Sequence, residues 1–123
     1  SDVKIKSGRT NLENQKKSGK IDFAGISAGI GKELSVAVSE AQDLTGAERT
    51  NALAGEEGKA FDVITKFSEA GASIDQLRQS ASKFSGVNGA GKERLLAYVK
   101  SIEAARKAQE LLTKANYDNL KVT

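Results

Sequence analysis

The residues best suited to chemistry form the stretch GVNGAGKE, from Gly86 to Glu93. It matches the first seven positions of the phosphate-binding loop G-x-x-x-x-G-K-[ST], in which backbone N–H groups and a helix N-terminus hold phosphates. The next position supplies a hydroxyl for Mg²⁺ in that loop, but here it is Glu93, whose carboxylate repels phosphate. The motif also needs a preceding strand, and residues 80–84 continue a helical pattern. We therefore interpret the stretch as a connection between two helices.

The chain contains few residues that could perform other catalytic chemistry. The chain contains no His and no Cys, so a Ser nucleophile lacks its usual base and a typical zinc or copper site lacks its ligands. Oxygen ligands for Ca²⁺ or Mg²⁺ remain, but no calcium-loop pattern is present. The pair Glu56-Glu57 could act as acid and base, yet in a polar stretch flanked by glycines it is more typical of a solvated helix start. We expect no enzyme activity, no cofactor and no metal.

The elements that would position these residues are helical. From Asp22, apolar residues recur every seven positions in an amphipathic stripe that Thr45-Gly46 ends: Phe23, Ile30, Ala37 and Leu44. Glycines near its beginning lower helix propensity, so a firm helix is expected only from about Lys32. A second helical region runs from about Ala47 to Ala70 and is expected to break in two at Gly55 and Gly58.

Two further helices follow. Ser73 and Gln76 have the spacing of a capping box, which predicts a short helix containing Ile74, Leu77, Ala81 and Phe84. The last helix is expected from about Lys92 to Asn116, with one apolar face made of Leu95, Val99, Ile102, Ala105, Gln109 and Leu112. The sequence thus predicts an all-α fold: a small bundle of three to five amphipathic helices in residues 21–123, with an extended basic N-terminal arm in residues 1–20.

The positive charge of the chain is concentrated in this arm. Six basic and two acidic residues give residues 1–20 a net charge of +4, whereas thirteen basic and fourteen acidic residues give residues 21–123 a charge of −1. Such an arm is a solvated tail, a contact to a neighbouring subunit or a nucleic-acid contact. It has no aromatic residue for base stacking, so nucleic acid is the weaker choice. The candidate partner contacts in the arm and the C-terminal tail are Val3, Lys4, Ile5, Lys6, Arg9, Lys16, Lys17, Lys20, Tyr117, Leu120 and Val122.

The absence of Pro and Cys suggests a class of protein. It is compatible with an ordinary helical chain, because Pro breaks helix interiors. It is also compatible with selection for refolding after passage through a channel, because Pro isomerisation is slow and Cys forms wrong cross-links. No window reaches the roughly 18 apolar residues of a membrane span, and the polar first twenty residues are unlike a signal peptide.

These observations favour a non-enzymatic structural subunit of a multi-copy assembly, in a virion or a secreted appendage. Its partners would be copies of itself or other subunits. The alternative is a small regulatory or inhibitory protein, cytoplasmic in location, that binds a single protein partner.

We predict that the Gly86 to Lys92 stretch does not bind nucleotide, because Glu93 replaces the hydroxyl and no strand precedes the loop. Titration calorimetry with ATP and Mg²⁺ should show no heat of binding. A micromolar affinity that disappears in Lys92→Ala would contradict this interpretation.

Overall fold

The computed structural model describes Leu12, residues 21–84 and residues 89–122. Within these residues the chain forms four helices and no strand. They are α2 (Phe23–Gln42), α3 (Gly46–Glu69), α4 (Ile74–Lys83) and α5 (Gly89–Val122). The predicted all-α bundle is confirmed, whereas the extended form of the basic arm lies outside the described residues.

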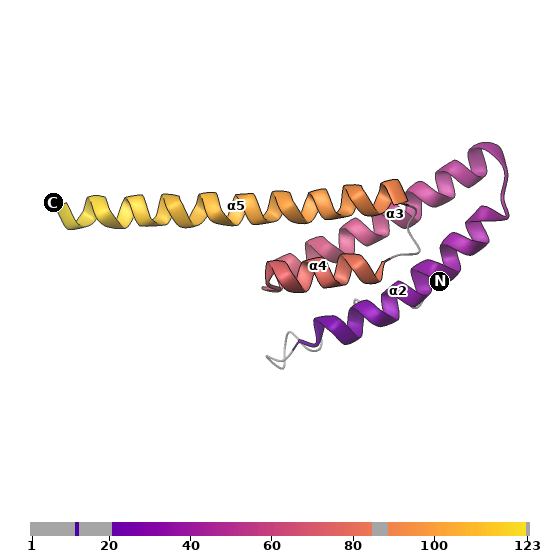
Figure 1. Ribbon diagram of the computed structural model, residues 1–123, viewed down its shortest axis with the longest axis horizontal. Helices are drawn as coiled ribbons and strands as arrows, with labels where there is room; N and C mark the ends of the chain where they lie inside the picture. Colours follow the sequence, from indigo (N-terminus) through magenta and orange to yellow (C-terminus); the bar gives the residue numbers. More distant parts are fainter. Residues whose placement is uncertain (1–11, 13–20, 85–88, 123) are drawn as a thin grey trace.

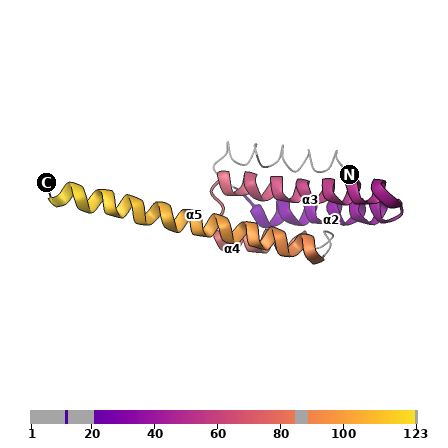
Figure 2. The ribbon, with the colours of Figure 1, turned by 90° about the horizontal axis from the view of Figure 1, so that it is seen from above.

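The helices form a compact body and a long projection. Helices α2 and α3 run side by side as a hairpin, and α5 passes α4 and continues far beyond the body (Figures 1 and 2). Helix α4 packs against α2, α3 and α5, and α5 also packs against α3. The shortest helix therefore contacts each of the other three.

One apolar cluster lies between the four helices. The ring of Phe23 meets that of Phe67 edge-to-face, with centroids 5.1 Å apart. The largest fully buried side chains include Phe67, Phe84, Leu34, Ile64 and Leu77. Leu12, which falls in the predicted arm, is only 4% exposed and belongs to the same cluster. At least one side chain of the 1–20 segment therefore packs into the core, and the domain boundary at residue 20 stays a prediction.

Helix α2 begins earlier than the sequence suggested. It starts at Phe23 rather than near Lys32, because the Asp22 carboxylate accepts a hydrogen bond from the Gly25 N–H at 3.0 Å and caps the first turn. Phe23 and Ile26 in this turn are buried in the core. Capping and burial together offset the low helix propensity of the glycines.

Helix α3 is also continuous, so the predicted break at Gly55 and Gly58 is wrong. Each glycine costs about 1 kcal/mol relative to alanine in a helix. The cost is offset because the following turns bury Val63, Ile64 and Phe67, and because this part of the helix forms ion pairs. Tertiary contacts thus override the local propensity.

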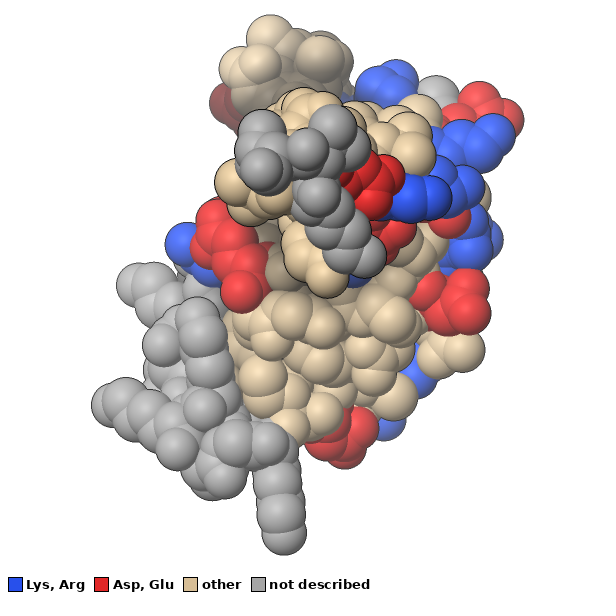
Figure 3. Space-filling view, turned by 90° about the vertical axis from the view of Figure 1, so that its left-hand side faces the viewer, with Lys and Arg blue, Asp and Glu red and all other residues tan. Residues whose placement is uncertain are grey.

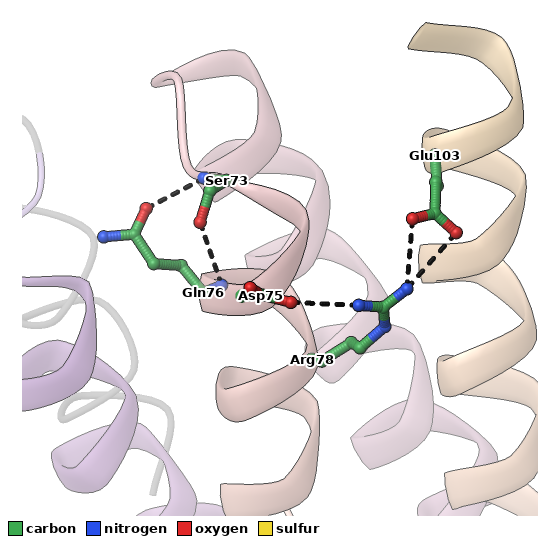
Figure 4. Close-up of polar contacts among 5 residues, drawn as sticks. All are labelled: Ser73, Asp75, Gln76, Arg78 and Glu103. Atoms are coloured by element: carbon green, nitrogen blue, oxygen red, sulfur yellow. Dashed lines mark hydrogen bonds and ion pairs between the residues drawn. The ribbon is translucent and has the colours of Figure 1, made fainter. Parts of the chain in front are cut away.

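The predicted capping box of α4 is confirmed. The Ser73 hydroxyl accepts a hydrogen bond from the Gln76 backbone N–H at 3.1 Å, and the Gln76 side-chain oxygen accepts one from the Ser73 N–H at 2.8 Å (Figure 4). In the same view, Arg78 links Asp75, at 3.0 Å, to Glu103 on α5, at 3.1 Å. Gly71, with φ +93°, provides the left-handed turn that ends the preceding helix.

Helices α2 and α4 lie very close together at Gly31. A Cβ atom added there would overlap the backbone carbonyl of Lys83 at the end of α4. One turn earlier on α2, the Ser27 hydroxyl bonds to the Ser80 hydroxyl at 2.7 Å, and both side chains are buried. Only glycine allows α2 to lie this close to α4.

We predict opposite effects of alanine at two neighbouring glycines of α2. Gly31→Ala should lower the free energy of unfolding by about 1–3 kcal/mol, because the methyl group overpacks the contact with Lys83. Gly29→Ala should raise it by about 0.5–1 kcal/mol, because nothing lies within 4 Å of an added Cβ and alanine favours the helix. Urea denaturation of the two variants measures this difference, and equal effects would contradict the close approach.

Candidate interaction surface

The first half of α5 is bound to the body along one face. Leu95 and Val99 are each 1% exposed, and Tyr98 and Ile102 pack beside them. The Tyr98 ring stacks on Phe61, with centroids 5.2 Å apart, and its hydroxyl is 2.6 Å from that of Thr65. This face holds α5 against α3 and α4.

A charged pair also joins α5 to α3. The Arg94 guanidinium donates two hydrogen bonds to the Glu57 carboxylate, at 2.6 and 2.7 Å. These hydrogen bonds hold the pKa of Glu57 below its ordinary value and raise the pKa of Arg94. Any stabilisation from the pair is therefore present above the ordinary pKa of a glutamate and is lost as the pH falls through the lowered pKa. It is modest, because the Arg94 side chain is more than half exposed.

Arg106 lies where α5 leaves the body. Its guanidinium donates hydrogen bonds to the Ala72 carbonyl at 2.7 Å and to the Ser68 hydroxyl at 3.1 Å. It thus fixes α5 to the turn between α3 and α4. Every described side chain beyond it, in residues 107–120, is exposed, and we refer to these residues as the projecting half of α5.

The projecting half carries large apolar side chains in solvent. Leu111 is 69% exposed, Leu112 56%, Tyr117 57% and Leu120 74%. Isolated exposed apolar residues are common, but four large ones within one short segment make the projecting half the candidate interaction surface.

The sequence pattern predicted that part of this surface would be buried in the core. Ala105, Gln109 and Leu112 were expected on the buried face of the last helix, but all three are exposed. The reason is that α3 and α4 do not extend past Arg106, so an apolar stripe continues without a neighbour to cover it. Arg106 itself was the available signal, because it takes a position in register with Leu95, Val99 and Ile102 where an apolar residue would continue the core.

Two of the predicted contacts lie on this surface. Tyr117 and Leu120 are exposed, but they belong to α5 itself, because the helix continues to Val122 instead of ending at Asn116. Leu111 and Leu112 were not among the predicted contacts. The predicted contacts whose side chains lie outside the described part are Val3, Lys4, Ile5, Lys6, Arg9, Lys16, Lys17, Lys20 and Val122.

The stretches first considered for chemistry are built into helices or their connection. Helix α4 ends at Lys83 and α5 begins at Gly89, so a helix rather than a strand precedes Gly91 and Lys92, as expected. Glu56 and Glu57 lie in the middle of α3 and not at a helix start. They are mostly buried and pair with Lys59 and Arg94, which corrects the expectation of a solvated position.

Charge is mixed on the face of the molecule seen from the C-terminal end of α5. Viewed along α5 from its C-terminal end, lysine and arginine side chains lie beside acidic ones (Figure 3). Among the described residues, no group of three or more acidic side chains is placed to hold a metal ion. No helix in the same residues has the length and apolarity of a membrane span.

Comparison with known proteins finds no matching family model, no matching curated protein and no matching solved structure.

We predict that the leucines of the projecting half contribute almost nothing to the stability of a single chain. Replacing both residues, as Leu111→Gln with Leu112→Gln, should change the free energy of unfolding by less than about 0.5 kcal/mol, because both side chains face solvent. Leu95→Ala, on the buried face of the same helix, should cost about 2–5 kcal/mol.

Chemical denaturation at low protein concentration makes this comparison, because association at high concentration would add to stability. A large loss of stability in the double variant of the dilute protein would mean that the projecting half packs on its own chain.

Proposed function

We propose that this chain is a non-enzymatic structural subunit of a multi-copy protein assembly, such as a virion or a secreted appendage. The observation that carries the proposal is the projecting half of α5, with Leu111 and Leu112 exposed beyond the body. A helix that projects from the body suits a subunit that contacts its neighbour outside its own core.

Packing against a neighbour would stabilise this helix. Helices shorter than about 12–15 residues are marginal in water, and most helix stability in proteins comes from packing an apolar face. The projecting half has the length of such a helix, and all its described side chains are exposed. Docking on another subunit would bury its leucines and supply the missing packing.

The composition supports an assembled protein rather than a catalyst. A chain without Pro and Cys avoids slow isomerisation and wrong cross-links, which helps a subunit that folds after export. The basic N-terminal segment offers a second contact, and contacts of its lysines with an acidic neighbour should weaken with salt. Leu12, the one described residue of that segment, is buried in the core.

We predict concentration-dependent self-association of the full chain that requires the projecting half. Sedimentation equilibrium over a wide concentration range should show species larger than the 13.0 kDa monomer. The Leu111→Gln, Leu112→Gln double variant should associate less, because the apolar area available for contact is reduced.

The control is the same polar substitution at an exposed leucine in the turn between α2 and α3, Leu44→Gln, which should leave association unchanged. A chain that stays monomeric at every concentration would instead favour the alternative, a regulatory protein that binds a single partner.

A further inference from the structure

One exposed side of α2 combines two opposite charges with an apolar side chain. Lys32 and Asp43 are exposed, and Val36 between them is 50% exposed. Lys32 and Asp43 are eleven residues apart, so they lie on one side of the helix, about 16.5 Å apart along its axis. Neither of them forms an ion pair with another described residue. We refer to Lys32, Val36 and Asp43 as the α2 face.

The projecting half of α5 repeats this pattern of charge and spacing. Lys107, Leu111 and Asp118 follow one another at intervals of four and seven residues, as Lys32, Val36 and Asp43 do. We refer to these three residues of α5 as the α5 face. All three are exposed, Leu111 by 69%, and the two charges have no ion-pair partner in the described part of the chain.

The α5 face points away from the body of its own chain. Ile102, which packs on the core, lies nine residues before Leu111 and therefore about 180° round the helix. The projecting half also extends away from the body that contains α2 (Figure 1). The α5 face of one copy is thus open to the α2 face of another.

The order of the charges selects an antiparallel arrangement of the two faces. Each face runs from lysine to aspartate along the chain, and each spans eleven residues. In an antiparallel pair, the lysine of each face therefore meets the aspartate of the other. Val36 and Leu111 then lie within one helical turn of each other, between the two ion pairs. A parallel pair would place lysine against lysine and aspartate against aspartate, where like charges repel.

Neighbouring charges favour a pair of unlike faces over a pair of like faces. Exposed Glu40 borders the α2 face, and exposed Lys114 borders the α5 face. With these neighbours, one basic and two acidic residues give the α2 side a charge of −1, whereas two basic and one acidic residue give the α5 side +1. Two α2 faces, or two α5 faces, would bring like net charges together. An α2 face and an α5 face bring opposite charges together.

The surface beside the α2 face has room for an incoming helix. A groove of about 690 Å³ lies next to Lys32 and Val36, between α2 and Lys83 at the end of α4. A docked α5 can therefore settle close to α2 on this side. Leu44 follows Asp43 directly but lies about 100° further round the helix axis, outside the contact.

We propose that the α5 face of one copy of this chain docks, antiparallel, on the α2 face of the next copy. The proposal rests on the proposed function, since it names the contact between the subunits. The two surfaces differ, so each copy in a pair keeps one free face for a further copy. Because α2 and α5 run in roughly opposite directions within one chain, successive copies point in roughly the same direction (Figure 1). The result is a head-to-tail series of copies rather than a symmetric dimer.

Charge reversal tests this contact in the full chain. Asp43→Lys and Lys107→Asp should each weaken self-association several-fold in sedimentation velocity, because each substitution places like charges opposite each other. The double variant Asp43→Lys, Lys107→Asp should recover most of the natural association, because the ion pair forms again with its charges exchanged. Urea denaturation of the dilute variants should give unchanged midpoints, since both side chains are exposed.

The matched control combines Asp43→Lys with Lys100→Asp. Lys100 is exposed on α5 two turns before Lys107, and this double variant has the same net charge as the one expected to recover. It should associate as weakly as Asp43→Lys alone. Recovery in both double variants would reflect net charge alone and would overturn the contact.

The single variants and the natural chain separate this contact from the assembly proposal. A natural chain that associates, but is weakened by only one of the single variants or by neither, overturns the contact and leaves the assembly proposal standing. The same holds if both weaken association and the double variant fails to recover it. A natural chain that is monomeric at every concentration contradicts self-assembly as well.

Discussion

The close approach of α2 and α4 at Gly31 is the constraint on which the rest of the bundle depends. Helix α4 has only ten residues, yet it contacts the other three helices. Its distance from α2 is set by the missing side chain of Gly31 and by the buried hydroxyl pair of Ser27 and Ser80. Since α5 packs on α4 and α3 but not extensively on α2, a displaced α4 would change the position of α5 as well. Interiors are close-packed, so such a displacement has no space to be absorbed locally.

The parts of the fold that the sequence predicted are those in which local signals and burial agree. The capping box at Ser73 and Gln76 is a contact between near neighbours, so its spacing alone identifies it. The stripe of Ile64 and Phe67 likewise identifies the face of α3 that is buried. The late start predicted for α2 near Lys32 and the break predicted in α3 at Gly55 and Gly58 were wrong, because glycine lowers helix propensity locally while the compensating contacts are distant in the chain.

The candidate surface was only partly predictable for the same reason. Tyr117 and Leu120 were expected as partner contacts because they are apolar residues that follow the predicted helix end at Asn116. Leu112 was expected to be buried, because a periodic pattern shows which face of a helix is apolar but not whether another helix reaches it. The end of the body at Arg106 is determined by the lengths of α3 and α4, so the only trace of it within α5 is the charged Arg106 in register with the buried Val99.

The projecting half has a further consequence for how tightly the chain could bind. A helix that lacks tertiary support exchanges between ordered and frayed forms, and the frayed form cannot present a continuous face. Part of the binding free energy must then be used to order the helix, so affinity depends on helix propensity as well as on contact. Residues of low helix propensity, such as Asn116 and Asn119, would weaken binding by favouring the frayed form even if they made no contact themselves. The chain could therefore set the strength of its assembly through residues outside the interface.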